Sequence, residues 1–246
     1  MRTLSFFTPV LVILVFTFSG CVENQAQLWQ QGGDILNSVM SEQKSLSPAE
    51  IGLGLKDALK VGTGNVVIQL GQTEGFNLDP AIHIPLPENL KKVQSTLDRI
   101  GLAYLLDDLE LKLNRAAEIA TPKAKTLFWQ AIQEMTFNDI MSIYNGPDDA
   151  ATQYFRNRMT PGLNREMQPI IDASLSQVGA IRAYEQAIGK YRSLPFVPDV
   201  RADLSTYVLG KGLDGIFYYL AREEKAIRTN PVKRTTELLR RVFGQH

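Results

Sequence analysis

Apolar residues recur at helical spacing along residues 203–228, and this is the longest such run after the N-terminal segment. At 100° per residue, one stripe of the run carries Leu213, Ile216, Phe217, Leu220, Ala221 and Ile227. Glu224 falls within the same stripe, and Arg228 follows it by four residues, an order that favours an ion pair. A carboxylate without a partner in an apolar setting is costly. We therefore expect a long core helix and a cationic or hydrogen-bonding partner for Glu224.

The remaining chain shows the same helical spacing, interrupted by prolines and turn residues. Ser47-Pro-Ala-Glu50 has the pattern of a capping box and predicts a helix from there to about Leu70. Further helices are expected over residues 88–100, 102–120, 122–135, 137–144, 147–159, 163–178, 180–191 and 232–243. No alternating run predicts a sheet. The sequence therefore predicts a single all-α domain of about ten helices over residues 46–246.

The first 20 residues have the pattern of a secretory signal, with Arg2, an apolar run over residues 4–18, and then Phe18-Ser-Gly-Cys21. Small residues before a cysteine resemble the lipobox of bacterial lipoproteins, in which the signal is cleaved and the cysteine carries acyl chains such as palmitate. An uncleaved anchor is the alternative, but the run is short for a membrane span. Residues 21–45 then form the lipidated N-terminus and a tether. Val22, instead of the Asp that retains lipoproteins at the inner membrane, favours the outer membrane and a domain facing the periplasm.

Composition excludes several classes of function. Without Arg2, the chain after the signal has 25 basic and 26 acidic side chains, so nucleic acid is not an expected partner. Cys21 is the only cysteine, which excludes disulfides and a catalytic thiolate within the chain. The only histidines are His83, expected to face solvent in an extended segment, and His246. A histidine-based triad or metal site is therefore disfavoured, and we expect no metal and no cofactor.

Three groups of polar residues are the candidates for a site: Asn114, Arg115 and Glu118; Asp148, Asp149, Thr152 and Arg156; and Glu223, Glu224 and Arg228. We expect the three segments to meet, with Glu224 bound by Arg115 or Arg156 in a network that fixes helix register. For Asp148 and Asp149 a simpler explanation is favoured, because a helix dipole stabilises carboxylates in its first turn. They form no loop of alternating oxygen ligands, so a calcium site is disfavoured.

Five motifs occur in order along the chain: Ile84-Pro-Leu-Pro87, Asn114-Arg-Ala-Ala-Glu118, Gly146-Pro-Asp-Asp-Ala-Ala-Thr-Gln-Tyr-Phe-Arg156, Leu213-Asp-Gly215 and Glu223-Glu-Lys-Ala-Ile-Arg228. Together they resemble a family of uncharacterised exported bacterial proteins that is known only as a domain of unknown function. The resemblance covers about residue 45 to the C-terminus. It implies a single helical domain with no agreed activity, and it suggests that the polar residues of these motifs belong together.

The favoured function is a non-catalytic, lipid-anchored module that binds an envelope protein, peptidoglycan or an apolar ligand between its helices. Gly210, Gly212 and Gly215 each cost about 1 kcal/mol relative to alanine in a helix, which predicts close packing or ligand approach at these positions. The alternative is a hydrolase or lyase that acts on a cell-wall glycan with Glu118 or Glu224 as its acid. Neighbouring arginines stabilise the ionised carboxylate and argue against this alternative.

Overall fold

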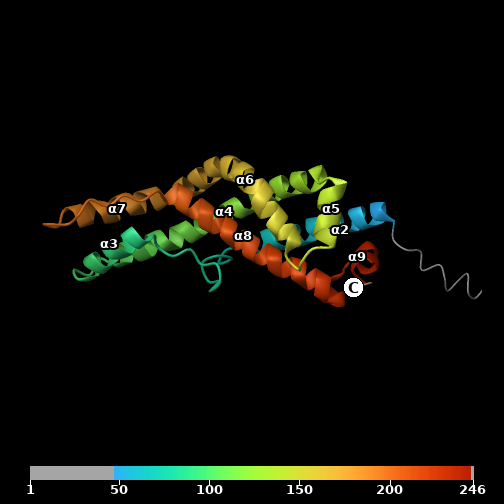
Figure 1. Cartoon of the computed structure of the whole chain (residues 1–246). Coiled ribbons are helices and arrows are strands. Elements are labelled where there is room, and N and C mark those ends of the chain that lie inside the picture. Colours follow the sequence, from blue (N-terminus) through green and yellow to red (C-terminus); the bar gives the residue numbers. More distant parts are fainter. Residues whose placement is uncertain (1–46, 245–246) are drawn as a thin grey trace, which may run out of the picture. The chain divides into compact units, whose positions relative to one another are not determined.

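The computed structural model describes residues 47–244, which belong to one compact unit. The helices are α2 (Pro48–Leu70), α3 (Glu88–Asp98), α4 (Tyr104–Glu134), α5 (Phe137–Tyr144), α6 (Ala150–Gln177), α7 (Ala180–Arg192), α8 (Leu204–Thr229), the 3-10 helix η1 (Pro231–Lys233) and α9 (Glu237–Phe243) (Figure 1). Residues 47–244 contain no strand, so the all-α prediction is confirmed. The predicted signal, Cys21 and the tether lie outside the described residues.

Capping residues set the ends of several helices as the sequence predicts. Ser47 Oγ accepts a hydrogen bond from the Glu50 N–H at 3.2 Å, and the Ser47 N–H donates to the Glu50 carboxylate at 2.9 Å. This capping box starts α2, which continues to Leu70 as expected. Thr136 and Asp139 form a second capping box at the start of α5. Both helices therefore begin where local side chains satisfy their first backbone donors.

Two pairs of predicted helices are single helices, which reduces the expected ten to eight α-helices and one 3-10 helix within residues 47–244. Helix α4 continues through Pro122, and α6 continues through Pro161 and Pro169. A proline inside a helix costs about 3 kcal/mol, and the prediction placed breaks at Pro122 and Pro161 for that reason. The buried residues Ala120 and Ala124 flank Pro122, so core packing on both sides of the proline offsets this cost.

The predicted C-terminal helix over residues 232–243 is shorter in the structure. Asn230 Oδ1 accepts from the Val232 N–H at 3.0 Å and starts η1. Thr236 Oγ1 accepts from the Leu239 N–H at 3.2 Å and starts α9 at Glu237. Two separate capping side chains thus divide a segment that apolar spacing alone predicts to be continuous.

Helices α4 and α8 contribute the largest share of the core. Helix α4 packs against α2, α6, α7 and α8, and α8 also packs against α2 and α6. The ring of Phe128 on α4 makes edge-to-face contacts with Phe155 on α6, at 5.7 Å between centroids, and with Phe217 on α8, at 6.1 Å. No helix within residues 47–244 combines the length and apolar composition that a bilayer span requires.

Candidate functional site

Residues 71–87, here called the strap, join α2 to α3 without regular secondary structure. The strap nevertheless buries four large side chains, Phe76, Ile82, Ile84 and Leu86. It lies against α8 at Gly215, where an added Cβ would be 2.8 Å from the Phe76 ring. A buried segment without helix or sheet partners must find other partners for its backbone N–H and C=O groups.

Asn114 and Glu118 on α4 supply partners for the strap backbone. Asn114 Oδ1 accepts from the Ile84 N–H, and Asn114 Nδ2 donates to the Ile84 carbonyl, each at 2.8 Å. Glu118 Oε1 accepts from the N–H groups of Phe76 and Asn77, each at 3.1 Å. Both side chains are buried. Two of the predicted site residues therefore hold the strap on α4.

Glu110 was not among the predicted site residues, but it is a third side chain of α4 that binds the strap. It lies four residues before Asn114 and thus on the same face of α4. Its Oε2 accepts from the Leu86 N–H at 2.9 Å, and its Oε1 lies 2.9 Å from His83 Nε2. His83 Nδ1 lies 2.8 Å from the Asn77 carbonyl oxygen. The His83 side chain is 31% exposed, so it faces solvent only in part, and both of its ring nitrogens have partners in the protein.

Arg115 on α4 also binds the strap. Its Nη1 donates to Glu118 Oε2 at 2.7 Å, and its Nη2 pairs with Glu74. Hydrogen bonds from Asn77 and from Arg115 lower the pKa of Glu74. The bonds to Glu118 and Glu74 in turn raise the pKa of Arg115. The expectation that Arg115 reaches Glu224 is therefore wrong.

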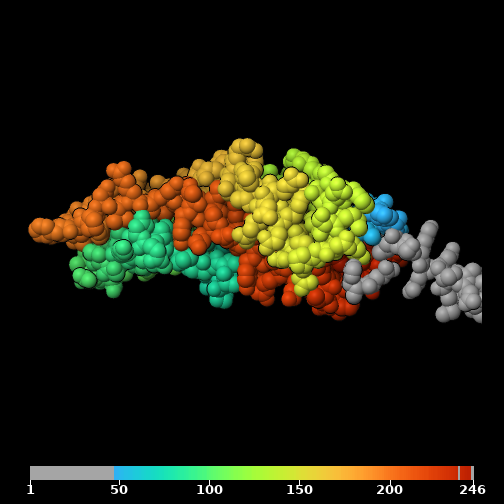
Figure 2. Space-filling view, in the orientation of Figure 1, coloured from blue at the N-terminus to red at the C-terminus, as the bar shows by residue number. Residues whose placement is uncertain are grey.

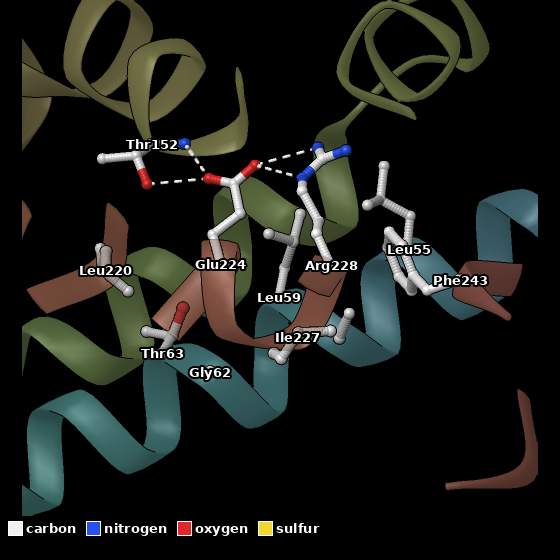
Figure 3. Close-up of a pocket in the computed structure, with 11 residues that line it drawn as sticks. Leu55, Leu59, Gly62, Thr63, Thr152, Leu220, Glu224, Ile227, Arg228 and Phe243 are labelled. Carbon is white, nitrogen blue, oxygen red and sulfur yellow. Dashed lines mark hydrogen bonds and ion pairs between the residues drawn. The ribbon is translucent and has the colours of Figure 1, made fainter. Parts of the chain in front are cut away.

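Glu224 is buried as predicted, but its main partners are backbone groups of α6 (Figure 3). Its Oε1 accepts from the Ala151 N–H at 2.9 Å. Its Oε2 accepts from both the N–H and the hydroxyl of Thr152, each at 2.9 Å. Ala151 and Thr152 lie in the first turn of α6, where backbone N–H groups lack partners within the helix and the dipole favours a negative charge. The Glu224 carboxylate therefore caps α6.

Arg228 pairs with Glu224 as their spacing of four residues predicts, whereas the expected contact from Arg115 or Arg156 is wrong. Its Nε and Nη2 lie 3.2 and 3.0 Å from Glu224 Oε1, and both side chains are about nine-tenths buried. Arg228 Nη2 also donates to the Ile143 carbonyl at 2.7 Å, and Nη1 donates to that of Tyr144 at 3.4 Å. These carbonyls end α5, where a positive charge is favoured. One ion pair on α8 thus caps the ends of two helices.

The remaining candidates are more exposed. Helix α6 begins at Ala150, so Asp148 and Asp149 precede it, and the prediction that they lie in its first turn is wrong. The Asp149 side chain makes no capping bond, because Glu224 already occupies the first backbone donors. Lys225 Nζ lies 3.6 Å from Asp148 Oδ2. The half-buried Glu223 side chain accepts from Asn65 Nδ2 at 2.9 Å and joins α8 to α2.

An open groove of about 580 Å³ lies between α6 and α8, which pack side by side. In Figure 2 their surfaces, yellow for the first half of α6 and red for α8, adjoin each other. The groove is lined by Asp148, Asp149, Thr152, Gln153, Arg156, Asp214, Phe217, Tyr218, Ala221, Arg222 and Lys225. The structure therefore brings one predicted group together here, while Asn114, Arg115 and Glu118 on α4 bind the strap. The three groups do not form a single site.

The geometry limits what each region can do chemically. The oxygens of Glu118 and Glu224 are buried and bound, which leaves them no access to a substrate. A cavity beside Glu224 has about 20 Å³, room for about one water molecule, and is too small for an apolar ligand. The groove has the volume of a typical ligand site. Within the described part of the chain, no three or more His, Cys, Asp or Glu side chains are grouped to hold a metal ion.

Comparison with known proteins places the chain in a family. A family model described as a protein of unknown function, DUF4197, matches residues 45–244. No curated protein and no solved structure matches the chain. The matched segment is most of the chain and includes the strap, both buried carboxylates and the groove. The chain therefore belongs to the DUF4197 family of proteins of unknown function.

Proposed function

We propose that this protein is a lipid-anchored binding module of the bacterial envelope and that it binds its ligand in the groove between α6 and α8. The signal-like residues 1–20 and the cysteine at position 21 support a lipid anchor, and Val22 supports an outer-membrane location facing the periplasm. Stable anchoring by several acyl chains would keep the helical domain at the membrane surface. An envelope protein or peptidoglycan fits the groove better than an apolar ligand does, since the groove is lined by charged side chains.

The observation that carries this proposal is the separation of the candidate polar residues into two classes. Asn114, Glu118 and Glu224 are buried and bound to backbone groups, so a structural role accounts for them. Asp148 and Arg156 are about half exposed, and their ion pairs contribute about 0–1 kcal/mol each; the Arg156 guanidinium also lies 4.8 Å from the centroid of the Phe217 ring. Structural roles do not account for the second class, and its members line one groove.

A photo-crosslinking amino acid in place of Ala221, inside the groove, tests the proposal in intact cells that export and acylate the protein. The matched control replaces Ile181, which is 41% exposed on α7 and does not line the groove. We expect a discrete crosslinked species from position 221 and none from position 181. Asp149→Asn combined with Arg222→Gln should abolish the species while the circular dichroism spectrum stays unchanged. Identical products from both positions, or none from position 221, would refute the groove as the binding site.

The anchor and the catalytic alternative need separate tests. Cys21→Ala should eliminate incorporation of labelled palmitate, and persistent incorporation would refute Cys21 as the acylated residue. A hydrolase acting on a cell-wall glycan would need accessible carboxylates, and Asp149 and Asp214 in the groove meet that condition. Release of glycan fragments that both Asp149→Asn and Asp214→Asn abolish would establish that alternative.

A further inference from the structure

The charges in the groove are balanced and mostly paired. Arg156 Nη1 lies 3.1 Å from Asp214 Oδ1, and Lys225 Nζ lies 3.6 Å from Asp148 Oδ2. The other two charged residues of the lining, Asp149 and Arg222, form no ion pair within residues 47–244. The groove therefore has no net charge, but it contains one carboxylate and one guanidinium that lack a partner of opposite charge.

These two groups come from different walls of the groove and are held in place by neutral neighbours. Asp149 directly precedes α6, and its Oδ2 accepts from Gln153 Nε2 at 3.0 Å. Arg222 lies on α8, with its guanidinium 5.6 Å from the ring centroids of Tyr218 and Tyr219. These contacts, together with the hydrogen bond that Arg222 Nη1 donates to the Tyr218 hydroxyl at 3.3 Å, position the guanidinium without neutralising its charge. Each wall thus presents one positioned charge to a ligand.

The α8 wall also contributes apolar side chains to the groove. Phe217, Tyr218 and Ala221 lie on α8 and line the groove, and Tyr218 is 41% exposed. A volume of about 580 Å³ falls within the range of about 300–1,000 Å³ that is typical of small-ligand sites. A peptide of a few residues matches this space and combines apolar and polar surface.

We propose that the ligand is a short peptide segment with a free ammonium group and a free carboxylate, bound at Asp149 and at Arg222 respectively. This inference rests on the proposed binding function of the groove and names its ligand class. Arginine binds carboxylates through two parallel hydrogen bonds, and an aspartate accepts hydrogen bonds from an ammonium group. A groove of zero net charge does not attract an anion or a cation at long range, so its two unpaired charges favour a dipolar ligand.

Three matched peptides test the ligand class on the acylated full chain in detergent micelles, by isothermal titration calorimetry. The probes are trialanine, N-acetyl-trialanine, which lacks the ammonium group, and trialanine amide, which lacks the carboxylate. We expect trialanine to bind at least about tenfold more tightly than either blocked peptide, because each blocked peptide leaves one groove charge without a partner.

Two variants assign the ends of the ligand. Arg222→Gln should abolish the preference for the free carboxylate and keep the preference for the free ammonium group, and Asp149→Asn should do the reverse. Arg182→Gln, at an exposed arginine on α7 outside the groove, is the matched control and should leave all three affinities unchanged. Equal changes in both preferences for either variant would refute the assigned orientation.

The peptide-binding experiment can fail while the crosslinking experiment succeeds, so the two proposals are tested separately. Equal affinity for the three peptides, or no binding of trialanine at about 10 mM, would overturn the dipolar ligand. A crosslinked species from position 221 in that case would leave the groove as the binding site for a ligand of another class. If trialanine does not bind and position 221 gives no crosslinked species, the proposal that the groove is a binding site is refuted.

Discussion

Glu118 and Glu224 are two buried carboxylates with nearly the same set of partners. Each accepts hydrogen bonds from two backbone N–H groups and pairs with an arginine of its own helix, three residues earlier in one case and four residues later in the other. Glu118 uses these bonds to hold an irregular strap, whereas Glu224 uses them to cap α6. The same local chemistry therefore supports two different kinds of segment.

The arginine partners predict that removing Glu224 lowers the free energy of unfolding more than removing Glu118 does. The Arg115 side chain is 24% exposed and also pairs with Glu74, so it keeps a partner and water when Glu118 is removed. The Arg228 side chain is 11% exposed, and its only carboxylate partner within residues 47–244 is Glu224. A buried carboxylate is thus costlier to remove when its arginine has no second acidic partner and little access to water.

Glu224→Ala should give the largest effect. It leaves Arg228 buried without a counter-charge and removes the acceptor for the first turn of α6. We expect the free energy of unfolding to fall by about 3–5 kcal/mol, measured by urea denaturation followed by circular dichroism. Glu224→Gln is the control, because it keeps an acceptor and should cost less. A loss below about 1 kcal/mol for the alanine variant would show that the pair contributes little.

Glu118→Ala should cost about 2–3 kcal/mol, because two buried N–H groups of the strap lose their acceptor while Arg115 keeps Glu74. Hydrogen exchange should accelerate at the amides of Phe76 and Asn77 and stay unchanged in the first turn of α6. A loss larger than that of Glu224→Ala would contradict the role assigned to the two arginines.

Gly215→Ala and Gly210→Ala form a matched pair of variants that tests the close packing of the strap against α8. An added Cβ at Gly215 would lie 2.8 Å from Phe76 Cε1 and 3.3 Å from Ile82 Cβ, so we expect a loss of about 1–3 kcal/mol. At Gly210 nothing lies within 4 Å, so alanine should stabilise the helix by about 0.5–1 kcal/mol. Melting temperatures that change in the same direction for both variants would contradict the close contact at Gly215.

The smallest effect is expected at Tyr219, whose hydroxyl donates to Asp79 of the strap. This hydrogen bond, together with burial, raises the pKa of Tyr219 from 10.0 to about 12. Because the pKa in the folded state is the higher one, the contribution to stability is complete below pH 10 and is lost as the pH rises towards about 12. An ultraviolet titration should show this phenol ionising late, and Asp79→Asn should move it to lower pH. An unchanged curve for Asp79→Asn would contradict the assignment.

Local signals predict much of the helical structure. The capping box at Ser47 and the apolar spacing of residues 203–228 give the bounds of α2 and α8 to within about a residue. Pro122 and Pro161 misled the prediction, because the cost of a proline is local whereas the packing that offsets it comes from distant helices. Of the three glycines predicted to allow close approach, Gly215 does so, Gly212 makes an ordinary contact, and Gly210 contacts nothing.

The burial of candidate site residues was predictable from the side-chain pattern, but their backbone partners were not. The position of Glu224 in an apolar stripe predicts its burial, but its partners are backbone N–H groups, which leave no mark in the sequence pattern. Glu110 was missed although its spacing of four from Asn114 was available as a signal. Asp214 and Arg222 were not predicted for a similar reason: with Tyr218 they repeat every four residues on the outer face of α8, whereas the apolar stripe that predicts this helix marks its inner face.

Glu110, Asn114 and Glu118 form a row along one face of α4. This row restricts the number of residues between its members more than it restricts the other residues of the helix. Successive members bind the strap at Leu86, then Ile84, then Phe76 and Asn77, so the helix and the strap run in opposite directions. Inserting or deleting one residue between Glu110 and Glu118 would rotate the later members by about 100° away from their acceptors and donors. Members of this family should therefore tolerate substitutions on the exposed face of α4 but keep the number of residues between these positions fixed.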